Sequence, residues 1–210
     1  MGFNVQRILY FHMPRTAGDS VRNSIQNSSQ MCCNTTHHHP SATLAMKTHM
    51  DISDKGSFTF VRNPYNRLYS AYNWIMKRDI KRNEELNSYD LKEYEYLKQY
   101  EDFNHFCRNI DEEIINQDFM IHFYPLNKWI WDSKLLITNI FKFEDLFNGS
   151  TLFEDWCKQK GLIYNGLVDK THMSDWTEKN YFHYFTSDSL TNTYNLYKKD
   201  FELFGYDEKK

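Results

Sequence analysis

Residues 7–20 read RILYFHMPRTAGDS, a short apolar run followed directly by a polar loop. The first six residues have the length and composition of a buried strand. Pro14 ends the strand because proline donates no hydrogen bond to the ladder, and Gly18 permits a tight turn or a close approach. In residues 21–27 apolar side chains recur one helical turn apart. We therefore predict a strand, a loop and a helix in this order.

The same order of elements recurs along the chain. Residues 58–61 form a second short strand candidate, and apolar positions at helical spacing predict a helix over 65–81. A third strand is predicted over 135–141, then a helix over about 150–160, and an apolar stripe over 190–204 lies on one helix. Residues 28–40 have no periodicity and are interpreted as a loop. Strands that alternate with helices predict an α/β fold, as a single three-layer domain over residues 1–210 with a mostly parallel central sheet.

The net charge of −3 conceals a division between two parts of the chain. Residues 1–82 hold 11 Lys and Arg against 4 Asp and Glu, whereas residues 83–210 hold 14 against 24. The basic N-terminal part suggests that an anion is bound there. The acidic run between residues 84 and 102, with Glu93 in it, is interpreted as a solvent-exposed helical face.

Composition excludes several classes of protein. With 40% hydrophobic and 17% aromatic residues the chain is too apolar for disorder, and its 7 Gly and 4 Pro leave little room for a turn-rich all-β fold. No apolar run approaches the roughly 20 residues of a transmembrane helix, and the N-terminus lacks the apolar stretch of a signal peptide. The four cysteines form neither a CxxC pair nor a disulfide framework. We expect a cytoplasmic protein with reduced thiols.

The two polar loops carry the candidate chemistry. In α/β folds a loop between a strand and its helix binds phosphate, because free backbone N–H groups and the helix dipole point at one spot. The first loop supplies Arg15 with the hydroxyls of Thr16 and Ser20, and the second supplies Arg62 with Arg67 and Ser70. The Walker pattern GxxxxGK[ST] is missing, which argues against an ordinary Mg-nucleotide NTPase.

These residues resemble the carbohydrate-type sulfotransferases of sulfotransferase family 2, in the group related to heparan sulfate 2-O-sulfotransferase and to bacterial and viral homologues. Residues 12–20, HMPRTAGDS, are similar to the family's 5′-phosphosulfate loop, H-x-P-K-T-A-G-T-S. Residues 60–72, FVRNPYNRLYSAY, look like its 3′-phosphate motif, F-V-R-[DN]-P-x-x-R-L-x-S-x-Y. Further matches are residues 38–42, 141–146 and 197–206. The acidic, mostly helical region 83–135 matches least.

The resemblance implies a P-loop-like nucleotide-binding fold and an enzyme of the EC 2.8.2 class. Its donor would be 3′-phosphoadenosine 5′-phosphosulfate (PAPS), its product adenosine 3′,5′-bisphosphate (PAP), and no metal is required. The acceptor would be a hydroxyl, with a saccharide favoured. The residues that this assigns to the donor are Arg15, Thr16, Ala17, Gly18, Asp19, Ser20 and Val21 for the 5′ end, Arg62 and Ser70 for the 3′-phosphate, and Lys170 as a further contact.

Two departures from the family pattern affect the expected mechanism. Arg15 replaces the usual lysine, so it would stabilise the leaving phosphate purely by its charge. Asp19 replaces a small or hydroxyl residue, and it would either cap the helix or touch the acceptor. A base is needed near neutrality, and the resemblance points to His39, then His37, in the loop where related enzymes carry a catalytic histidine.

Other interpretations stay open at this point. A non-catalytic nucleotide-binding module, a kinase, or an enzyme that sulfates tyrosine or a small molecule would use much of the same loop chemistry. A zinc site that combines the 37–39 histidines with Cys32 and Cys33 is disfavoured, because ligands so close in sequence cannot all reach one tetrahedral ion. We expect neither nucleic acid nor a membrane as partner, leave the oligomeric state open, and favour a microbial or viral origin.

Overall fold

The computed structural model describes residues 8–26, 31–33, 56–77, 88–132, 134–137, 139–167 and 181–208. The chain divides into two compact units. The first combines residues 1–62 with 128–173, and the second combines 63–127 with 174–210. Each unit is therefore assembled from segments that are distant in the sequence. The single domain over residues 1–210 stays a prediction.

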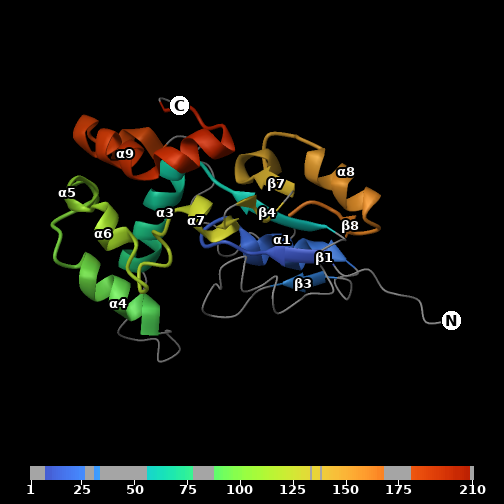
Figure 1. Cartoon of the computed structure of the whole chain (residues 1–210), viewed down its shortest axis with the longest axis horizontal. Helices are drawn as coiled ribbons and strands as arrows, with labels where there is room; N and C mark the ends of the chain where they lie inside the picture. The colour runs from blue at the N-terminus through green and yellow to red at the C-terminus, as the bar shows by residue number, and fades with distance from the viewer. Residues whose placement is uncertain are drawn as a thin grey trace. The chain divides into compact units, whose positions relative to one another are not determined.

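A sheet of four parallel strands forms the centre of the first unit, in the order β3-β1-β4-β7. Figure 1 shows β4 in teal beside β1 in blue. Because parallel strands need a crossover connection, a helix is expected after each strand, and α1 follows β1 in this way. The mostly parallel sheet confirms the predicted α/β fold class. The elements are β1 (Ile8–Phe11), α1 (Gly18–Ser24), β3 (Met31–Cys33), β4 (Ser57–Val61) and β7 (Asn139–Lys142).

The edge strand β3 lies where the sequence predicts only a loop. Residues 28–40 lack alternation of polar and apolar side chains, yet residues 31–33 pair with β1, in the register that sets Leu9 opposite Cys32. Three residues are too few to display a period of two. The loop prediction is therefore wrong for this segment.

The predicted strand over residues 135–141 is divided in the structure. Its start belongs to β6 (Lys134–Leu135), which pairs antiparallel with β5 (Trp131–Asp132). Only β7, which begins at Asn139, joins the main sheet. The apolar run LLI is continuous across the end of β6, so composition alone predicts one strand where the backbone forms two.

Aromatic side chains fill the core on one face of the sheet. Tyr10 of β1 stacks on Phe58 of β4, with ring centroids 4.6 Å apart and planes 5° from parallel. Phe153 of α8 (Leu152–Gln159) meets the ring of Phe60 edge-on at 4.8 Å, and Val21 of α1 belongs to the same cluster. Both helices thus bury apolar surface against this face, and the helix predicted over 150–160 is confirmed. The strand β2 (Ile25–Gln26) follows α1, and β8 (Ile163–Tyr164) follows α8. These two short strands pair with each other in antiparallel fashion.

Two cysteine side chains are buried in the two cores. Cys107 lies in the second unit and Cys157 in the first, and both are free thiols. Burial raises the pKa of Cys157 to about 12, because apolar surroundings disfavour the thiolate. These two residues fill space as small apolar side chains.

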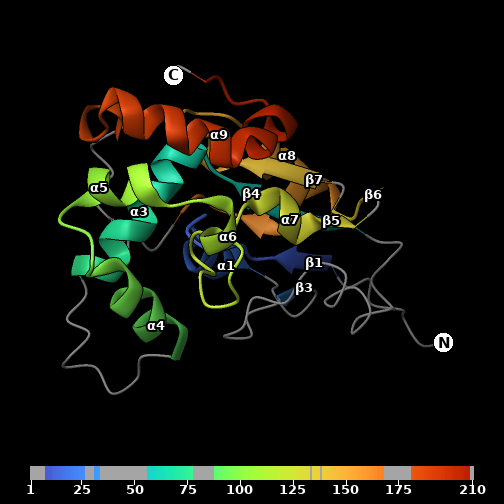
Figure 2. The ribbon, with the colours of Figure 1, turned by 60° about the vertical axis from the view of Figure 1, so that its left-hand side comes forward.

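Helices make up the described part of the second unit. They are α3 (Pro64–Lys77), α4 (Ser88–Leu97), α5 (Phe103–Asn109), α6 (Glu112–Ile115), η3 (Tyr181–Tyr184) and α9 (Ser187–Phe204). The long helix α9, red in Figure 2, packs on α3 and α5. Tyr197, Phe201 and Phe204 are buried there, which confirms that the C-terminal apolar stripe belongs to the core.

The buried carboxylate of Asp200 fastens α9 to the start of α7 (Leu126–Ile130). It accepts hydrogen bonds from the backbone N–H of Leu126 at 2.8 Å, from the backbone N–H of Asn127 at 2.7 Å and from the Asn127 amide at 2.6 Å. Burial raises the pKa of Asp200, while Arg67 and these donors oppose the rise. The carboxylate satisfies N–H groups that a helix start otherwise leaves unpaired.

Replacing Asp200 by Asn tests this fastening. Whichever way the amide turns, its NH₂ group faces an N–H donor, so we expect the free energy of unfolding to fall by about 2–3 kcal/mol. Urea denaturation measures the change. The matched control is Glu202→Gln on the same helix, which breaks an exposed pair with Lys198 and should cost less than about 0.5 kcal/mol. Equal losses in the two variants would contradict the assignment.

Candidate functional site

The loop between β1 and α1 has an unusual backbone. Arg15 and Ala17 both adopt φ of 65°, the left-handed region that non-glycine residues rarely occupy. Ala17 is also the residue before α1, and no side chain caps the helix. Turns of this type direct consecutive backbone N–H groups into a concavity that suits an anion. The binding of an anion by this loop stays a prediction.

Thr16 holds the loop in this conformation. Its side chain is fully buried, and its hydroxyl donates a 2.8 Å hydrogen bond to the Met13 carbonyl. The hydroxyl proton of Thr16 is thus already donated to a hydrogen bond within the loop. The structure favours a role for Thr16 in shaping the site over direct contact of its side chain with a ligand.

Glycine is needed at position 18 because the His12 ring leaves no room for a side chain, and not because of its backbone torsion angles. A Cβ atom at this position would lie 1.8 Å from the imidazole of His12, so any side chain would displace that ring. The His12 ring stacks in turn on Tyr10, with centroids 6.0 Å apart. The close approach expected at this glycine is therefore an approach of a neighbouring side chain within the same loop.

The three residues that follow Gly18 have different surroundings. Asp19 is exposed and pairs with Arg22 at 3.1 Å, so it does not cap the helix. Ser20 is buried on the loop side of α1. Val21 lies in the core, and its N–H already donates to the Ala17 carbonyl at 2.9 Å. Val21 is thus poorly placed to contact a ligand.

Arg62 connects the second loop with the first. It follows β4 directly, is only 5% exposed, and donates from Nη1 to the Arg15 carbonyl at 3.3 Å. Its guanidinium lies 4.3 Å above the ring of Phe143, the first residue of η2 (Phe143–Leu146). Within the first unit the guanidinium of Arg62 therefore lies against the backbone of Arg15, the other residue to which the family resemblance assigns a phosphate.

Arg67 has a different role from the one its position in a basic motif suggests. It is 1% exposed on α3, and it donates to the carbonyls of His122 at 3.1 Å and Tyr124 at 2.7 Å. Burial lowers its pKa, while Tyr197, Asp200 and Glu93 oppose the fall. The guanidinium of Arg67 lies in the interior of the second unit, where backbone carbonyls accept its hydrogen bonds. Ser70, one turn further along α3, is also buried.

A model of the sulfotransferase family matches residues 3–207, nearly the whole chain. This chain belongs to the sulfotransferase family. Sulfotransfer is accordingly its class of activity, and the family points to a nucleotide that donates sulfate as the cofactor. No curated protein and no solved structure matches the chain. No helix among the described residues of this sulfotransferase is long and apolar enough to cross a membrane.

Three predicted site residues of the sulfotransferase fall outside the described residues. They are His37, His39 and Lys170. The assignment of a catalytic base to His39 or His37, and of a donor contact to Lys170, therefore stays a prediction.

One cluster in the second unit was not foreseen as a site. Glu93 was expected on an exposed face, but it is fully buried and its carboxylate lies 2.6 Å from Nδ1 of His122. Asp90 approaches the same nitrogen at 3.9 Å. Burial raises the pKa of Glu93, and the contact with His122 opposes that rise. The only sequence signal was the spacing of Asp90 and Glu93, which sets both on one helix face.

The contact between His12 and Gly18 can be tested by a double-mutant cycle. We expect Gly18→Ala to lower the free energy of unfolding by about 1–3 kcal/mol, because the imidazole must leave its place. In a His12→Ala background the added methyl group meets no ring, so the same substitution should cost clearly less. Urea denaturation of the four proteins gives the coupling. An identical cost in both backgrounds would contradict the contact.

Proposed function

We propose that this sulfotransferase moves the sulfuryl group of PAPS to an acceptor hydroxyl, with a saccharide as the favoured acceptor. The observation that supports this most is the hydrogen bond from Arg62 to the Arg15 carbonyl, since it couples two cationic loops in one unit. A nucleotide with phosphates at both its 5′ and 3′ ends needs two such loops. The donor, when bound, supplies an activated sulfuryl group whose leaving group is a phosphate.

Arg15 is proposed to stabilise the charge that develops on that leaving phosphate. Arg15 lies in the loop between β1 and α1, and its left-handed backbone is of the kind that turns neighbouring N–H groups toward an anion. A guanidinium stays protonated at neutral pH, so Arg15 acts through charge and hydrogen bonds. Such preorganised donors are a large part of catalysis in group transfers to and from phosphates.

Arg62 is proposed to bind the 3′-phosphate. A guanidinium that is 5% exposed and already held by a carbonyl and an aromatic ring loses little further entropy on binding a phosphate. Its planar donors match two phosphate oxygens. Ser70 and Lys170 are proposed as additional contacts on the grounds of the sequence motifs alone.

His39, or His37 in its place, is proposed to take the proton from the acceptor hydroxyl. An imidazole has a pKa near the working pH, which suits a general base. The exposed pair of Asp19 with Arg22 lies beside the phosphate loop, so Asp19 is proposed to face the acceptor.

Selective stabilisation by PAP tests the nucleotide site. At about 100 times its Kd, PAP should raise the Tm by roughly 5–10 °C, whereas ATP with Mg²⁺ should raise it far less. Arg62→Ala should weaken PAP binding about 10- to 100-fold, because it removes a charge-assisted contact. The control is Lys158→Ala, which changes an exposed lysine of the same unit that pairs with Glu154. A larger shift with ATP would favour a kinase and refute the proposal.

Turnover separates an enzyme from a non-catalytic nucleotide-binding module. We expect His39→Ala to reduce kcat by about 10²- to 10⁴-fold while the affinity for PAP stays unchanged. Transfer of labelled sulfate to a panel of glycans, tyrosine peptides and phenols identifies the acceptor and supplies the assay. Wild-type turnover in the variant would remove His39 as the base. Binding of PAP without transfer to any acceptor would favour the module.

A further inference from the structure

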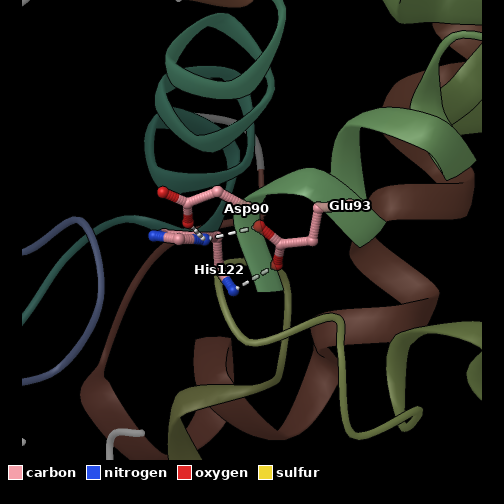
Figure 3. A group of neighbouring side chains, drawn as sticks. All are labelled: Asp90, Glu93 and His122. Atoms are coloured by element: carbon pink, nitrogen blue, oxygen red, sulfur yellow. Dashed lines mark hydrogen bonds and ion pairs between the residues drawn. The ribbon is translucent and has the colours of Figure 1, made fainter. Parts of the chain in front are cut away.

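Three side chains with metal-binding atoms converge in the second unit. Asp90 and Glu93 lie one turn apart on α4, and His122 lies in the turn that precedes α7. One ligand atom from each residue can be chosen so that all three atoms lie within 4.8 Å of one another. Figure 3 shows both carboxylates turned toward the imidazole of His122.

This cluster is shielded from water. Glu93 is 0%, Asp90 4% and His122 9% exposed. Carboxylates are rarely buried so completely unless they are paired or coordinate a metal. Two of them here face one imidazole, and a single divalent cation balances both of their charges.

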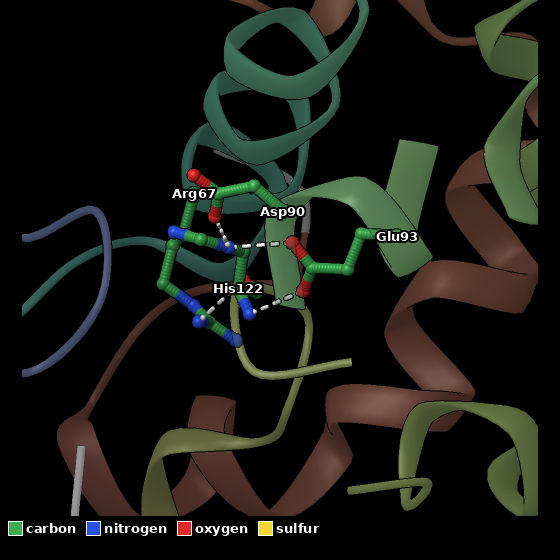
Figure 4. A network of polar contacts seen from close by, with 4 residues as sticks. All are labelled: Arg67, Asp90, Glu93 and His122. Carbon is green, nitrogen blue, oxygen red and sulfur yellow. Dashed lines mark hydrogen bonds and ion pairs between the residues drawn. The ribbon is translucent and has the colours of Figure 1, made fainter. Parts of the chain in front are cut away.

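The neighbouring groups hold His122 in place from two directions. Its backbone N–H donates to Oε1 of Glu93 at 2.8 Å, and its carbonyl accepts from Arg67 at 3.1 Å. Figure 4 shows Arg67 and Glu93 reaching this residue from different sides. These two backbone hydrogen bonds fix the position of residue 122 between α4 and α3. Arg67 itself is directed to backbone carbonyls, including that of Tyr124 at 2.7 Å.

We propose that Asp90, Glu93 and His122 bind one Zn²⁺ ion, which joins α4 to the turn before α7. Imidazole nitrogen with carboxylate oxygen is a donor set that zinc accepts, and three protein ligands leave a fourth position for water. On binding, the proton shared by Nδ1 of His122 and Oε2 of Glu93 leaves to solvent, and this hydrogen bond is exchanged for one metal bond from each residue. In this proposal the ion ties α4 to the turn before α7, and water occupies its fourth position.

The experiment must exclude zinc binding by the 37–39 histidines. The full chain is therefore prepared with His37, His38 and His39 all replaced by Ala, freed of metal with a chelator, and titrated with Zn²⁺ by calorimetry. We expect one ion per chain. Loss of all zinc binding in this triple variant would overturn the proposal.

Asp90→Asn in the same background then tests the ligands. This substitution leaves the Glu93 pair with His122 in place while removing one ligand charge, so we expect zinc affinity to fall about 100-fold or more. The matched control is His105→Ala, because His105 forms an exposed pair with Glu101 at 4.0 Å. Unchanged affinity in Asp90→Asn, or an equal loss in the control, would refute the site.

A second measurement decides the question if Asp90→Asn does not fold. Amide exchange of the triple-histidine variant is followed with and without Zn²⁺. The proposal expects slower exchange in α4 and in residues 120–124 when zinc is present, because the ion joins these two segments. Exchange that stays the same in both segments would overturn it.

Discussion

The parallel pairing of β1 with β4 is the constraint on which the first unit depends. It sets Phe11 opposite Thr59, and the buried Thr59 hydroxyl reinforces the register by donating to the Phe11 carbonyl at 2.7 Å. Because both strands run in the same direction, the loops that follow them leave from the same edge of the sheet. This arrangement brings Arg62 within hydrogen-bond distance of the Arg15 carbonyl. A shift of one residue would also turn the stacked aromatic rings away from the core.

Much of this arrangement can be predicted from the sequence, because its determinants are local. Pro14 ends a strand by its chemistry, and a glycine before a helix signals a close approach. The parts that could not be predicted depend on distant partners. The short strand β3 exists because β1 offers an edge, and residues 135–141 are divided because only β7 finds a partner in β4 of the main sheet. Neither partner is visible in the segment itself.

The roles of charged residues are still harder to predict from the sequence. Arg62 and Arg67 occur in one motif, five residues apart, yet one stands beside the phosphate loop and the other is directed to backbone carbonyls in the interior of the second unit. Glu93 belongs to an acidic run that suggests exposure, yet it is fully buried against His122. The charge count predicts an anion site within the basic part of the chain. It does not separate the charges that bind ligands from those that hold the fold together.

The contact of His12 with Gly18 also restricts which substitutions this loop can accept. The imidazole occupies the volume that any side chain at position 18 would need. The two positions therefore cannot change independently: a larger residue at 18 requires a smaller one at 12, or a loop of different path. Since the same loop carries Arg15, substitutions at the end of β1 would alter the proposed anion site through packing, without touching a ligand. The end of β1 and the start of α1 are therefore coupled by this one contact.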